Sequence, residues 1–317
     1  MSLLEIVGKR LLIGVATLLF VSVLVFVGTE ILPGDVAFAI LGQGATPELV
    51  SQIRERLGLD QPLHLRYVIW LSNFISGDFG TSLANGADIG SEIARRGANT
   101  IILALTTALV AVPLSVLLGL ISAVKPSGIV DKIISSISLA LISFPDFLIA
   151  VLLVTLFAVK LNWLPAIASI RPSYDFFDWL RILTLPVTAL SFTILAHMIR
   201  MTRSAVISVL SSPAIEMALL KGVPRRRLLL YHALPNALGP IINVVALNMA
   251  YLISGVVVVE TLFNYPGLGR FMVEAVTNRD VPIVQACSMI FCSFYVILNI
   301  AADILAIISN PRIRYQK

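Results

Sequence analysis

The sequence predicts an all-α integral membrane protein with six transmembrane helices and an external helical cap between the first two. Three observations predict this fold: an apolar composition, six apolar stretches of membrane-spanning length, and an uneven distribution of basic residues among the connecting segments. The chain has 317 residues, of which 58% are hydrophobic and 13% charged, and its mean hydropathy is +0.94. Soluble domains carry about 25% charged residues. The composition therefore excludes an ordinary soluble domain.

Six apolar stretches are long enough to cross the hydrocarbon core of a bilayer, which takes about 20 helical residues. They comprise residues 11–31, 100–124, 133–159, 182–201, 241–263 and 283–309. The first follows Lys9 and Arg10 as a secretory signal would, but its apolar core is longer and no small-residue cleavage site follows. We therefore expect an uncleaved membrane anchor.

The basic residues orient the predicted helices. If the N-terminus lies inside, six crossings return the C-terminus inside, and the inner segments are 1–10, 125–132, 200–240 and the tail after 309. These segments hold 13 of the 23 lysines and arginines and only three acidic residues. Because cytoplasmic loops carry an excess of Lys and Arg, the sequence predicts that both termini are cytoplasmic. The net charge of +5 thus belongs to a membrane face, and we expect no nucleic-acid partner.

The external segment 33–99 is too long for a simple connection and carries its own helix signals. Residues 46–48, Thr-Pro-Glu, supply an N-cap hydroxyl, a proline at the first helical position and an acid in the first turn. This helix is predicted to run to about residue 57. A second amphipathic helix is predicted over 64–75, ended by Gly77. Together these helices form the predicted external cap.

The long inner segment contains the most informative motif. Residues 216–222 read Glu-Met-Ala-Leu-Leu-Lys-Gly, and after nine residues positions 232–235 read His-Ala-Leu-Pro. This pattern resembles the EAA loop of binding-protein-dependent ATP-binding-cassette (ABC) importers, which reads E-A-A, three residues, G, nine residues, I-x-L-P. Met217 replaces the usual Ala and His232 the usual Ile, but every spacing agrees.

Other strings extend the resemblance over essentially the whole chain. They occur at residues 32–35, 57–62, 77–80, 142–145, 259–263, 266–269 and 310–312. In order and spacing they resemble the dipeptide, oligopeptide and nickel permease branch, and also the glutathione-importer permeases.

The resemblance implies a type I ABC importer fold. Residues 1–93 would form the first helix and external segment, residues 94–309 a five-helix core with a cytoplasmic coupling loop at about 201–240, and residues 310–317 a cytoplasmic tail. It also implies a bacterial cytoplasmic (inner) membrane protein that forms a pathway for peptides or peptide-like solutes. The implied partners are a homologous second permease, two nucleotide-binding ATPase subunits that hold ATP and Mg, and an external solute-binding protein. Membrane lipid surrounds them.

The EAA-like loop is the expected contact with the ATPase. By resemblance the coupling residues are Glu216, Ala218, Lys221, Gly222, His232, Leu234 and Pro235. Independently of the resemblance, glycine at 222 can adopt the left-handed turn that closes a helix, and the mixed apolar and basic residues could press one helix face into a partner groove. The alternative is a basic amphipathic loop resting on anionic lipid headgroups.

Asp146 is the candidate for contact with cargo, together with Ser143 and Pro145. An ionisable residue within a span is expensive and marks a functional site, and Pro145 breaks helical hydrogen bonding and frees backbone carbonyls. The alternative is a carboxylate neutralised near a kink or lying at the external interface. Glu30 and Glu260, near external span ends, are expected to be solvated or to cap helices.

Enzyme motifs are absent from the sequence. There is no G-x-x-x-x-G-K-[ST] phosphate loop, no H-E-x-x-H, no C-x-x-C and no G-x-S-x-G. We therefore expect no catalytic residue, no metal site and no cofactor on this chain, with ATP hydrolysis on partner subunits. The alternative function is a stand-alone secondary transporter driven by an ion gradient, although the duplicated halves typical of that class are not evident.

Overall fold

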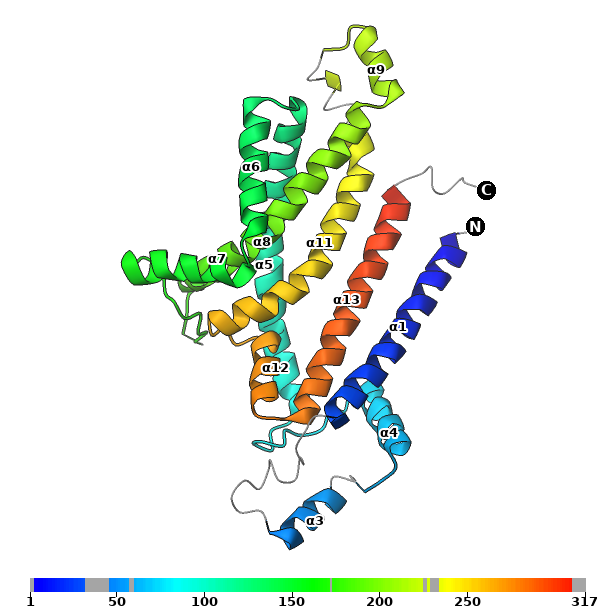
Figure 1. Cartoon of the computed structure of the whole chain (residues 1–317), viewed down its shortest axis with the longest axis vertical. Coiled ribbons are helices and arrows are strands. Elements are labelled where there is room, and N and C mark those ends of the chain that lie inside the picture. The colour runs from blue at the N-terminus through cyan, green and yellow to red at the C-terminus, as the bar shows by residue number, and fades with distance from the viewer. Residues whose placement is uncertain are drawn as a thin grey trace. The chain divides into compact units, whose positions relative to one another are not determined.

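The computed structural model describes residues 3–31, 46–56, 60–171, 173–224, 227–228 and 234–309. Apart from one isolated β-bridge, Thr81 to Asp88, the regular structure of these residues is helical. The elements are α1 (Leu3–Ile31), α3 (Pro47–Arg56), α4 (Leu63–Ser76), α5 (Ile89–Val124), α6 (Ile129–Ser143), α7 (Asp146–Leu153), a π-helical segment (Val154–Lys160), α8 (Phe176–Leu210), α9 (Pro213–Leu220), α11 (Leu234–Leu262), α12 (Leu268–Thr277) and α13 (Val281–Ser309) (Figure 1).

Five described helices are long and apolar enough to cross a membrane: α1, α5, α8, α11 and α13. The sixth candidate is a bent pair, in which α6 is followed by α7 and its π-helical continuation at an angle of 100°. The all-α fold with six predicted spans is confirmed when this pair counts as one span. The span predicted at 133–159 is therefore present as a bent pair, broken at Pro145, where the sequence indicates an interruption of the helix.

The break between α6 and α7 has a local cause. Phe144 is extended, with φ −90° and ψ 135°, because a residue before proline is pushed away from helical angles. Pro145 itself has φ −60° and ψ 141° and offers no N–H to continue the ladder. Two adjacent residues thus turn the chain, and α7 points away from the axis of α6 in Figure 1.

By contact density the chain divides into two compact units. The first comprises Met1–Leu12, Ile101–Tyr265 and Ile297–Lys317, and the second comprises Ile13–Thr100 and Pro266–Val296.

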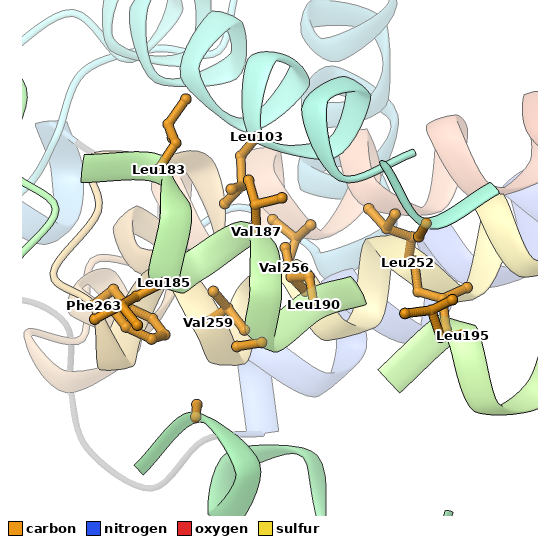
Figure 2. Packing of buried hydrophobic residues seen from close by; sticks show 14 of the residues in the cluster. Leu103, Leu183, Leu185, Val187, Leu190, Leu195, Leu252, Val256, Val259 and Phe263 are labelled. Carbon is orange, nitrogen blue, oxygen red and sulfur yellow. The ribbon is translucent and has the colours of Figure 1, made fainter. Parts of the chain in front are cut away.

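Helix α8 is the centre of the first unit. In the most apolar stretch of α8, 78% of the residues are buried. In the corresponding stretches of the other four long helices, 39% or less are buried. Figure 2 shows Leu190 of α8 beside Val256 of α11, within a cluster that also includes Leu103 of α5. Because lipid is as apolar as these side chains, the contacts are stabilised mainly by van der Waals packing.

Glu260, near the end of α11, is fully buried at 0% exposure. The expectation that water solvates it is wrong, because Phe263 and Tyr265, both also at 0% exposure, fold back over the end of the helix. The backbone N–H of Tyr265 donates to the Glu260 carbonyl. Burial, and then the negative charge of Glu260, raise the pKa of the Tyr265 phenol.

The second unit contains the two predicted cap helices. The Thr46 hydroxyl accepts a bond from the backbone N–H of Leu49 at the start of α3, and Gly77 closes α4 with φ +83°. Glu30 is half-buried rather than solvated, since both its carboxylate oxygens accept bonds from Arg66 of α4. This ion pair fixes α4 to the end of α1.

A close approach between α5 and α8 explains one glycine. A Cβ added to Gly119 would lie 2.7 Å from the Cβ of Thr202 and 3.0 Å from the carbonyl oxygen of Ile199. Small residues at such crossings let helix backbones approach closely in membranes.

We predict that Gly119→Ala destabilises the protein by about 1–3 kcal/mol, because overpacking forces the helices apart. Thermal unfolding of the purified protein in detergent measures this as a lower Tm. Gly28→Ala is the matched control, since a Cβ there meets nothing within 4 Å. Equal melting temperatures for the two variants would contradict the close approach.

Candidate functional site

The motif loop begins where α8 ends. Residues 201–210 belong to α8 and residues 234–240 to α11, so the predicted loop at 201–240 is shorter than expected. The difference arises because both helices continue beyond their apolar stretches. Figure 1 shows α9 beyond the end of α8, connected by the short turn at Ser211 and Ser212.

One face of α9 packs against the end of α8. Ile215, at 6% exposure, and Leu228 form a small buried cluster against which Ala218 and Leu210 pack. Gly222 follows with φ +80°, which confirms the predicted left-handed turn. A Cβ at Gly222 would meet nothing within 4 Å, so the requirement for glycine here is conformational rather than steric.

The opposite face of α9 and the turn are exposed. Met217 is 55% and Leu220 76% exposed, and Glu216 and Lys221 lie exposed beside them. An apolar pair flanked by an acid and a base, on a helix held by its other face, is suited to insertion into a groove of a partner protein.

The remaining coupling candidates are distributed as follows. Leu234 begins α11 half-buried and packs beside Ala237, whereas Pro235 is exposed. His232 lies outside the described residues. The structure thus brings Glu216, Ala218, Lys221 and Gly222 together on one short segment.

A buried ion pair holds the end of α8, and sequence reasoning missed it. Asp131 of α6 is 4% exposed, and its carboxylate accepts bonds from Arg203 of α8, Nε at 2.6 Å and Nη2 at 2.8 Å. The Ser122 hydroxyl and the Ser127 backbone N–H also donate to it. The pair spans 72 residues of sequence, so the available signal was only an acid within a basic segment.

We predict that Asp131→Asn destabilises the protein by about 3–5 kcal/mol, because it leaves the Arg203 guanidinium uncompensated in a mostly buried site. The measurement is Tm in detergent. The matched control is Asp303→Asn, whose partner Arg10 is 49% exposed and whose loss should cost at most about 1 kcal/mol. A control variant as unstable as Asp131→Asn would contradict the special role of the buried pair.

The three cargo candidates lie at the bend between α6 and α7. Ser143 is exposed, but its hydroxyl donates to the carbonyl of Leu139 on its own helix, at 2.9 Å. Pro145 is exposed, and Asp146 is half-buried in the first turn of α7. Asp146 therefore lies in the first turn of α7, and the helix dipole favours its negative charge there.

Metal ligands do not gather in the part of the chain that the structure describes: it contains no group of three or more His, Cys, Asp or Glu side chains that could hold an ion. Cys287 is buried and Cys292 half-buried, and both are free thiols.

Comparison with known proteins identifies the class to which this fold and loop belong. Residues 115–315 match the family described as binding-protein-dependent transport system inner membrane component. Residues 3–104 match the family described as binding-protein-dependent transport system membrane component, N-terminal. The chain belongs to this family of membrane permeases, which has the type I importer fold. It is a multi-pass transport subunit and not an enzyme.

Individual relatives cover almost the whole chain. The "Probable peptide ABC transporter permease protein y4tP" of Sinorhizobium fredii is 36% identical over 307 residues, 97% of this chain and 98% of the relative. The glutathione transport system permease protein GsiC of Escherichia coli K12 is 37% identical over 314 residues, 99% of this chain and 100% of the relative. The chain is therefore similar to ABC importer permeases of the peptide and glutathione type, and a stand-alone secondary transporter is not favoured.

Proposed function

We propose that this chain forms half of a translocation pathway for peptides or peptide-like solutes, glutathione included, and couples that pathway to a separate ATPase through α9. The observation that supports the coupling role is that α9 exposes Met217 and Leu220 on one face, while its other face packs onto α8 through Ile215. The cargo class is supported by the relatives, one named a probable peptide permease and the other a glutathione permease.

The remaining assignments follow the family resemblance. The partners are a homologous second permease, two ATPase subunits carrying ATP and Mg, and an external solute-binding protein. Residues 1–93 serve as first helix and external segment, 94–309 as core and 310–317 as tail. The excess of basic residues in those segments supports a cytoplasmic position for both termini and for α9.

The packing suggests how force would reach the pathway. Glu216, Ala218, Lys221 and Gly222 would meet the ATPase, and His232, Leu234 and Pro235 would shape the entry to α11. A displacement of α9 would be passed to α8, because the two share the Ile215 cluster.

The test is reconstitution of the complete importer in liposomes, in which uptake should require ATP and the binding protein. We predict that Gly222→Val lowers uptake about tenfold or more with normal membrane insertion, since a left-handed conformation costs a residue with a Cβ about 1–2 kcal/mol. Gly86→Val is the control, because Gly86 also has positive φ, +71°, and open space. Gradient-driven uptake by this chain alone would contradict the coupled function, and normal uptake by Gly222→Val would contradict the coupling role of this turn.

The orientation is tested by cysteine labelling in intact cells, in a background with Cys287 and Cys292 replaced by serine. We predict that Ser51→Cys reacts with an impermeant maleimide and Ser211→Cys does not. Both positions are exposed, so accessibility within the chain does not bias the comparison. Labelling of Ser211→Cys without permeabilisation would reverse the orientation.

Asp146, with Ser143 and Pro145 beside it, is proposed to offset the cost of desolvating a cationic amine of the cargo. We predict that Asp146→Asn slows uptake of a peptide with a free amino terminus about two- to fivefold and leaves the N-acetylated peptide unaffected. Asp60→Asn, in the external segment, is the matched control. If Asp146→Asn changed the uptake of both peptides by the same factor relative to wild type, a role for this residue in contacting the cargo amine would be contradicted.

A further inference from the structure

A cavity of about 600 Å³ lies between α6 and α8. Its polar lining consists of Ser135 from α6 and His197, Arg200, Arg203 and Ser204 from α8. The cavity is open on one side, and its volume is in the range of pockets that bind small organic ligands. Neither the coupling loop nor the bend at Asp146 uses this cavity.

Among the residues that the structure describes, the cavity holds one positive charge without an ionic partner. Arg203 and Ser135 both donate to Asp131, so the charges of Arg203 and Asp131 cancel. Arg200 is exposed, and its guanidinium has neither a hydrogen bond nor an ion pair with any residue that the structure describes. None of the lining residues that the structure describes is acidic. The five N–H donors of Arg200 are therefore available to an anion.

The neighbouring histidine indicates that this cavity faces water or another protein rather than acyl chains. His197 is exposed and lies one turn further into the apolar stretch of α8 than Arg200, with its ring 6.1 Å from that of Tyr251 on α11. Polar side chains at membrane depth almost always face a bundle interior or a water-filled cavity.

We propose that this cavity binds a carboxylate of the cargo, with Arg200 as the principal ligand and His197 and Ser204 as further donors. The inference rests on the proposed function, because a cargo carboxylate would reach this cavity only if the chain forms part of a translocation pathway. Guanidinium pairs with carboxylate through two parallel hydrogen bonds, and every peptide with a free C-terminus carries such a group.

The test uses the complete importer, with its ATPases and binding protein, in liposomes. Uptake of a tripeptide with a free C-terminal carboxylate is compared with uptake of the same tripeptide as its C-terminal amide. For each cargo the rate of Arg200→Gln is divided by the wild-type rate, which removes the selectivity of the binding protein. We expect the ratio to fall about tenfold for the acid, as for a charge-assisted hydrogen bond, and to stay near one for the amide.

Two further variants and one change of lipid complete the design. Arg200→Lys should recover part of the acid uptake, because it restores the charge without the paired donors. Arg181→Gln, also on α8 and exposed but outside the cavity, should leave both ratios near one. Repeating the assay without anionic lipid should leave the Arg200→Gln ratios unchanged.

The remaining outcomes overturn the inference in distinguishable ways. Equal loss for acid and amide, or no loss for either, removes the carboxylate site while the proposed function stands. A defect that disappears without anionic lipid reassigns the cavity to a phospholipid headgroup. Failure of the wild-type importer to take up either tripeptide contradicts the proposed cargo class, and this inference with it.

Discussion

The first unit depends on close packing around α8 in a setting where burial alone provides little. In water, covering an apolar helix removes it from an unfavourable solvent, but lipid solvates the same side chains well. The helix is held instead by fit: Gly119 admits Thr202 of α8, and a Cβ at Gly255 of α11 would come within 3.3 Å of Leu190. Glycine at these two positions allows the high burial of α8.

The interruption between α6 and α7 follows from a second constraint. Irregular backbone at membrane depth is tolerated only where protein or water covers it, since hydrocarbon cannot satisfy free N–H and C=O groups. Ser143, Phe144 and Pro145 are exposed in this chain. At membrane depth, these three residues would therefore need cover from protein or from water.

The sequence predicted the features that depend on local chemistry. Apolar length located the long helices, the Thr-Pro-Glu signal located α3, and the glycine after Lys221 was correctly expected to be left-handed. It could not predict what depends on distant neighbours. Glu260 was expected in water because hydropathy does not reveal that Tyr265 folds over it, and Arg203 was counted as a loop charge although its partner lies 72 residues earlier.

The family motif was likewise readable from spacing alone, since the positions of Glu216 and Gly222 are fixed relative to each other within one short helix and turn. The cavity at Arg200 was not, because Ser135 and Arg200 belong to different helices and only their packing places them around one space. Sites built from one segment are visible in a sequence, whereas sites built between segments require the tertiary structure.

The contact between Gly119 and Thr202 has a geometric consequence. Because a side chain at position 119 would clash with Thr202 and with the carbonyl oxygen of Ile199, the crossing of α5 and α8 leaves no room for one. At 1.5 Å per residue, the crossing lies about 12 Å from the α9 end of α8 and about 39 Å from its beginning. The crossing thus divides α8 into a short arm that leads to α9 and a longer arm that leads to Phe176, and Pro186 interrupts the longer arm.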